Sequence, residues 1–180
     1  MALTLPFRRN TFLKGTAPLY VALVDEARDP RFYTEMGVED TIDGRFDLVA
    51  LYVLFMIRRL RLGEAQGFKD KHREAAAQAL FDYMLADFDR NLREMGIGDL
   101  SIGKRMKKIG AALYGRAQAY DQAMASGDKA ILVECLRRNL YREADVAEAI
   151  LTEMADHVVA LSARFADQPY SDLVAGKLIK

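Results

Sequence analysis

The sequence predicts an all-α protein, a single-domain bundle of about six to eight helices around a buried central apolar helix. Apolar residues recur at spacings of three and four along most of the chain. Helix-forming residues dominate the composition, and β-branched residues are sparse. Three of the 4 prolines lie near expected helix boundaries, where they separate one periodic segment from the next.

The length and composition agree with one globular domain. A chain of 180 residues is able to bury roughly 70% of its unfolded surface, so it needs no disulfide or metal to fold. Hydrophobic residues make up 51% and charged residues 29%, which is a globular balance. We divide the chain into an N-terminal extension (1–15), a helical domain (16–166) and a C-terminal tail (167–180).

The first helix is expected at 16–27, with Thr16 as its N-cap and Pro18 in its first turn. A short extra turn ended by Gly37 should follow. The next segment is dense in Gly, Asp and Thr, which indicates a turn and a helix start. Its candidate caps are Asp40, Thr41 and Asp43.

The central helix should then run to about Leu62. It contains the longest uninterrupted apolar run, at 48–57. As a helix this run spans about 15 Å, half of a ~30 Å hydrocarbon core, so it should not cross a membrane. Burial is the simplest interpretation. A part left uncovered would instead form a groove for an apolar partner segment.

Four further helices are expected, at about 70–95, 99–125, 129–140 and 145–165. Asp99 and Asp128 are the candidate caps of the second and third of these. Gly103 and Gly110 are seven residues apart, so we expect a neighbouring helix to approach closely there.

No catalytic or metal-binding constellation is evident, and we expect no cofactor. Glu153 and His157 share a helix face, but a boundary histidine beside a carboxylate is the simpler interpretation. Cys135 lies at core spacing. The enzyme alternative is a metal- or quinone-handling bundle, and its candidate residues are Asp82, Asp87, Asp89, Glu153 and His157.

Basic and acidic residues balance at 26 each, which argues against a dedicated DNA-binding protein. A local basic docking patch remains, and it consists of Lys104, Arg105, Lys107 and Lys108. Ribosomal RNA or anionic lipid headgroups would fit it, and a solvated helix face is the alternative. The single cysteine and the lack of a secretory signal favour a cytoplasmic location, with peripheral association to the inner membrane left open.

Four sequence blocks occur in an order that resembles the ubiquinol–cytochrome c chaperone family. They are GVEDTIDGRFDL (37–48), LFDYMLADFDRNLREMGIGDLSIGKRMKK (80–108), YGRAQAY (114–120) and RNLYR (138–142). Glu39, Tyr52 and Gly103 depart from residues common in that family.

The resemblance implies a non-enzymatic assembly factor that binds newly made cytochrome b for the ubiquinol–cytochrome c reductase. Mitochondrial members act with a small partner protein near the ribosome. The matching positions that we expect to form or frame the partner surface are Asp40, Arg45, Phe46, Asp47, Arg93, Glu94, Asp99, Lys104, Lys107, Tyr114 and Arg116. A peripheral membrane or ribosome adaptor that holds no client is the remaining alternative.

Overall fold

The computed structural model describes residues 13–63, 67–96, 98–142 and 144–179, and within them it is helical, with no strand. The prediction of an all-α bundle is therefore confirmed. In chain order the helices of the described residues are α1 (Leu13–Ala27), α2 (Arg31–Thr34), α3 (Ile42–Leu62), α4 (Asp70–Glu94), α5 (Asp99–Ser126), α6 (Lys129–Asn139), α7 (Glu148–Asp167) and α8 (Tyr170–Val174).

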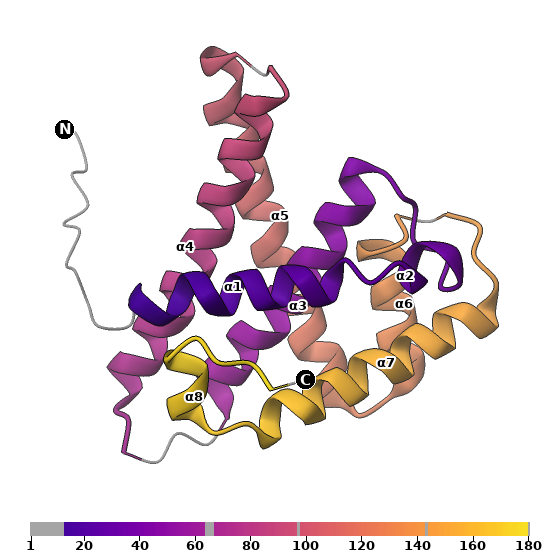
Figure 1. Cartoon of the computed structure of the whole chain (residues 1–180). Coiled ribbons are helices and arrows are strands. Elements are labelled where there is room, and N and C mark those ends of the chain that lie inside the picture. The colour runs from indigo at the N-terminus through magenta and orange to yellow at the C-terminus, as the bar shows by residue number, and fades with distance from the viewer. Residues whose placement is uncertain (1–12, 64–66, 97, 143, 180) are drawn as a thin grey trace.

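Helix α3 is the centre of the molecule, and α1, α4, α5 and α7 all pack against it (Figure 1). Every residue from 48 to 57 is buried, as expected for a helix surrounded by others. No residue of this run is exposed, so the run forms no open groove, but Leu54, Phe55 and Ile57 line a small cavity between α3 and α5. Of the three candidate caps, Thr41 is the N-cap, and its side chain accepts a hydrogen bond from the Gly44 N–H at 3.1 Å.

Helices α4 and α5 form a long antiparallel hairpin whose tip stands away from the rest of the molecule (Figure 1). Gly98 occupies the N-cap position of α5, so the prediction of Asp99 as its cap was wrong by one residue. On α6 the expected cap is confirmed, because Asp128 accepts a hydrogen bond from the Ala130 N–H at 2.8 Å. The base of the hairpin is anchored, since α4 packs on α1 and α3 while α5 packs on α6.

The N-terminal helix begins at Leu13, so Thr16 lies inside it and the prediction of a cap there was wrong. Its start packs against α8, and a Cβ added to Gly15 would lie 2.0 Å from the Val174 carbonyl oxygen. The chain then returns to α7, where the Gln168 side chain hydrogen-bonds both backbone groups of Ile179, at 2.8 and 3.0 Å. The division of the chain into extension, domain and tail stays a prediction.

Among the described residues, no helix combines the length and the apolar character that crossing a membrane requires.

Candidate functional site

A buried carboxylate ties three parts of the chain together. Asp47, one turn into α3, is only 2% exposed. Its Oδ1 accepts a hydrogen bond from Nη1 of Arg116 on α5, and its Oδ2 accepts one from Nε of Arg142 at 2.5 Å. Arg142 also donates to Asp43 at 2.8 Å. We call these four side chains the ion cluster, and they hold the start of α3 against α5 and the α6–α7 connection.

The backbone at Arg142, in the turn after α6, is unusual for a residue with a side chain. Its φ is +53°, which is a left-handed conformation. Such a residue costs about 1–3 kcal/mol and persists only where its surroundings hold it. The hydrogen bond to Asp47 also raises the pKa of the Arg142 guanidinium. Sequence reasoning considered Asp43 only as a helix cap and did not select Arg142, although the RNLYR block was a signal for the arginine.

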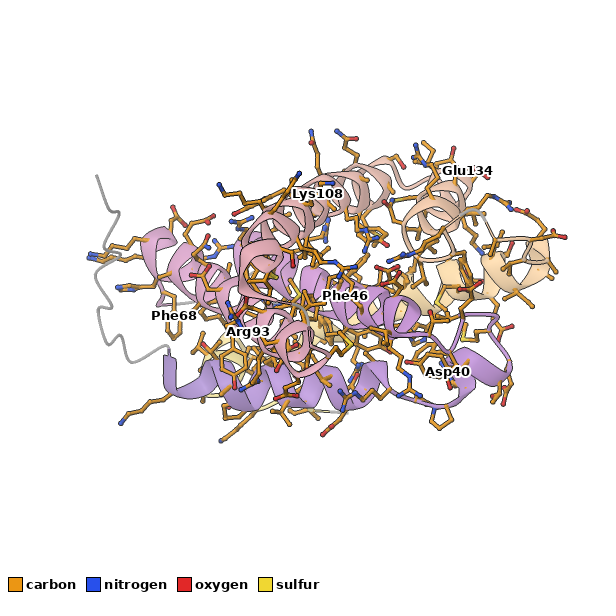
Figure 2. All side chains as sticks on the ribbon, turned by 90° about the horizontal axis from the view of Figure 1, so that it is seen from above. Asp40, Phe46, Phe68, Arg93, Lys108 and Glu134 are labelled. Atoms are coloured by element: carbon orange, nitrogen blue, oxygen red, sulfur yellow. The ribbon has the colours of Figure 1, made fainter. Side chains whose placement is uncertain are left out.

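Two more predicted residues lie at the start of α3 on the surface. Arg45 donates from Nε to Asp40 at 2.6 Å, and this hydrogen bond lowers the pKa of the Asp40 carboxyl group. The next residue, Phe46, is half-buried, and its ring centroid lies 3.8 Å from that of Phe88 on α4. Figure 2 shows Phe46 near the middle of the molecule and Asp40 toward one edge.

The remaining predicted residues lie on the hairpin. Arg93 pairs with Asp89 at 2.7 Å, as its spacing on the helix predicts, and Arg90 pairs with Asp87. The Asp99 side chain lies outside the part that the structure describes. Five others are exposed, and they are Glu94, Lys104, Arg105, Lys107 and Lys108.

One face of α5 is open where close packing was expected. A Cβ added to Gly103 or Gly110 would meet nothing within 4 Å. Among the described residues no neighbouring helix approaches closely there, so that prediction was wrong. The reason is that α5 turns a different stripe inward, with Ile102 and Leu113 buried. Lys107 and the 57% exposed Tyr114 share the open side with the two glycines, at spacings of four, three and four. We call these four residues the glycine face.

The glycine face leads to a hollow between α5 and the end of α3. Ala117 follows Tyr114 by three residues and lines a cavity of about 60 Å³ together with Leu62 and Asp121. The Leu62 side chain is 65% exposed. Tyr114 is held in place by Phe81 of α4, since their ring centroids are 4.9 Å apart. Apolar and small residues therefore lie along α5 from the hairpin toward the body of the molecule.

His157 has other neighbours than the sequence indicated. Its Nε2 lies 3.0 Å from the Tyr52 hydroxyl and its Nδ1 lies 3.1 Å from Nη2 of Arg31, so its partner is not Glu153. A guanidinium only donates, so Nδ1 accepts and the ring proton is on Nε2. Burial, followed by the charge of Arg31, lowers the pKa of His157 and keeps the ring neutral.

The carboxylates of the enzyme alternative do not converge on this histidine. Asp82 accepts a hydrogen bond from Gln78, and Asp87 accepts one from Tyr20, while His157 and Glu153 lie on α7. In the ranges that the structure describes, no three His, Cys, Asp or Glu side chains are grouped to hold a metal ion. Cys135 is in the core, and burial raises the pKa of its thiol.

The arrangement is that of a helical binding protein, in which charged side chains fix the fold and a helix face is left open. The chain belongs to the ubiquinol–cytochrome C chaperone family, whose model matches residues 34–179. It is similar to the crystal structure of the Cbp3 homolog from Brucella abortus, with 29% identity, a TM-score of 0.79, and 97% of this chain and 94% of that chain covered. No curated protein matches the chain. The predicted resemblance is confirmed, and the protein is an assembly chaperone for respiratory complex III.

Proposed function

We propose that this chaperone binds newly made cytochrome b, the membrane-embedded subunit of the ubiquinol–cytochrome c reductase, and that the glycine face receives it. The observation that carries the proposal is an open helix face in a protein whose family acts on this complex. Gly103 and Gly110 have no side chain, so the backbone of an apolar helix is able to approach α5 closely.

The neighbouring side chains suit an apolar helical client. Amphipathic and apolar helices bind in grooves through side chains spaced three and four apart, and the glycine face has this spacing. Tyr114 offers a ring fixed by Phe81, and the exposed Leu62 extends the apolar surface toward the cavity beside α3. Aromatic anchors of this kind contribute much of the binding energy in protein interfaces.

The ion cluster fixes the position of α5, the helix that carries the glycine face. Arg116 follows Tyr114 by two residues and is held by Asp47, so α5 has a fixed position relative to α3 at this point. Asp47 and Arg116 are therefore positioning residues, whose charged groups are engaged within the chain. The predicted partner residues divide accordingly, with Tyr114 facing the client and Asp47 and Arg116 framing it. Lys107 lies at the edge between the glycine face and the outer side of α5.

Deletion of the gene tests the proposal in cells. We expect the deletion strain to contain less assembled ubiquinol–cytochrome c reductase on native gels and less of its activity, while the other respiratory complexes are unchanged. A copy of the gene on a plasmid should restore both. A normal level of the reductase in the deletion strain would refute the proposal.

A further inference from the structure

We propose that the outer side of α5 docks the protein onto a bilayer surface that carries anionic phospholipid headgroups. The surface consists of Lys104, Arg105, Lys107 and Lys108, which we call the basic face. All four side chains are exposed, and none forms an ion pair with another described residue. This inference does not depend on the identity of the client.

Along α5 itself, the charge around the basic face has one sign. Residues 100–120 contain five basic side chains and no acidic one. Arg116 is turned inward to Asp47, which leaves four cations on the outside. Lys104, Lys107 and Lys108 share a helix face because they are three and four residues apart, and Arg105 lies beside Lys108. A negatively charged plane therefore complements this side of α5.

The position of α5 allows a plane to reach it. The hairpin stands clear of the other helices (Figure 1), and Figure 2 shows Lys108 on the side of the molecule away from α1. The next outward residues, Ala111, Ala112 and Gly115, are small and exposed, so their own side chains do not keep a flat surface away from the helix.

A lipid surface fits this chemistry better than RNA does. Three of the four cations are lysines, which act as point charges, whereas arginine is the residue suited to bidentate phosphate contacts. Proteins that bind single-stranded RNA also stack bases on free aromatic rings. The exposed aromatic side chain nearest in sequence is Tyr114, and its ring packs on Phe81. Headgroups require neither bidentate contacts nor stacking.

Vesicle flotation with the full-length purified protein tests the proposal. We expect binding to vesicles of phosphatidylcholine mixed with phosphatidylglycerol, and little binding to phosphatidylcholine alone. Each cation close to an anionic bilayer contributes about fivefold to the partition coefficient. The triple variant K104E/K107E/K108E should therefore bind the mixed vesicles at least tenfold more weakly. High salt should release the wild-type protein in the same way.

The matched control changes the charge equally elsewhere. Arg28 lies just after α1, and Lys71 and Arg138 lie on α4 and α6. All three are exposed, and none forms an ion pair with a described residue. The variant R28E/K71E/R138E should keep most of the vesicle binding, and both variants should keep the wild-type circular dichroism spectrum.

Three outcomes would overturn the proposal. Equal losses in the two variants would show a dependence on net charge alone. Unchanged binding in K104E/K107E/K108E would place the lipid contact elsewhere. Binding of ribosomal RNA that the triple variant abolishes, without binding to anionic vesicles, would identify the basic face as an RNA surface.

Discussion

The side chain of Asp47 accepts hydrogen bonds from two arginines that lie 69 and 95 residues away in the chain. No local pattern in the sequence connects these residues. The sequence therefore placed Asp47 and Arg116 in the same predicted partner surface without revealing that their side chains form an ion pair. Local interactions were predictable. Thr41 caps its helix and Cys135 is in the core because both depend on residues within one or two helical turns.

Replacement of the buried carboxylate should cost substantial stability. In Asp47→Asn the guanidinium of Arg116, whose side chain is only 16% exposed, loses its charged partner. Breaking a buried ion pair from one side costs about 3 kcal/mol. Urea unfolding followed by circular dichroism measures this loss.

Asp40→Asn is the matched control, because it removes a carboxylate from the exposed pair with Arg45. We expect little change in stability, as solvent screens such pairs. Similar losses in the two variants would contradict the structural role of the ion cluster.

Stability should also depend on pH through His157. Its pKa is lowered in the folded protein, so the unfolded chain binds the additional proton first as the pH falls. The contribution of His157 is therefore complete above its unfolded pKa of about 6.5 and declines below it. We expect a lower urea midpoint at pH 5.5 than at pH 7.5, and His157→Gln should reduce this difference. An unchanged pH dependence in His157→Gln would show that it has a different origin from the site between Tyr52 and Arg31.

At the scale of the elements, the sequence predicted the long helices to within a few residues, because periodicity and turn residues are local signals. It misjudged the environment of Gly103 and Gly110. Glycine indicates that a close approach is possible, but the face of α5 that α4 covers depends on packing between helices. The complete burial of residues 48–57 also depends on packing between helices, because it results from helices on several sides of α3.

Open glycines in a helix should tolerate and even favour a methyl group. Gly110→Ala should stabilise the protein by about 0.5–1 kcal/mol, because alanine has the higher helix propensity and its Cβ meets nothing. Gly15→Ala should instead destabilise it, since the Cβ would clash with the Val174 carbonyl oxygen. Thermal unfolding of both variants measures the difference. Destabilisation by Gly110→Ala would show that a neighbour covers this face.

A larger side chain on the glycine face should separate function from stability. Gly110→Leu should fold normally but restore the reductase poorly in the deletion strain, because the side chain blocks the approach of the client. Ala163→Leu places the same side chain at an exposed position on α7 and should restore the reductase fully. Full restoration of the reductase by Gly110→Leu would show that the glycine face does not bind the client.

At the scale of the whole molecule, the bundle consists of a packed body and a protruding hairpin (Figure 1). The body contains α3 and the ion cluster, and the contact between Arg116 and Asp47 fixes the position of α5 where it enters the body. The hairpin carries the glycine face and the basic face. The class of fold and the family were visible in the sequence, whereas the division between framing and open residues depends on contacts between distant segments.

Site-specific crosslinking to the client tests the central claim most directly. A photoreactive amino acid at Tyr114 of the purified full-length protein, added during synthesis of cytochrome b, should yield a crosslinked product with the nascent chain. Val159 on α7 is also an exposed apolar position, 46% exposed, and serves as the control. We predict strong crosslinking from position 114 and little from position 159. Equal crosslinking from both positions, or none from 114, would contradict the account.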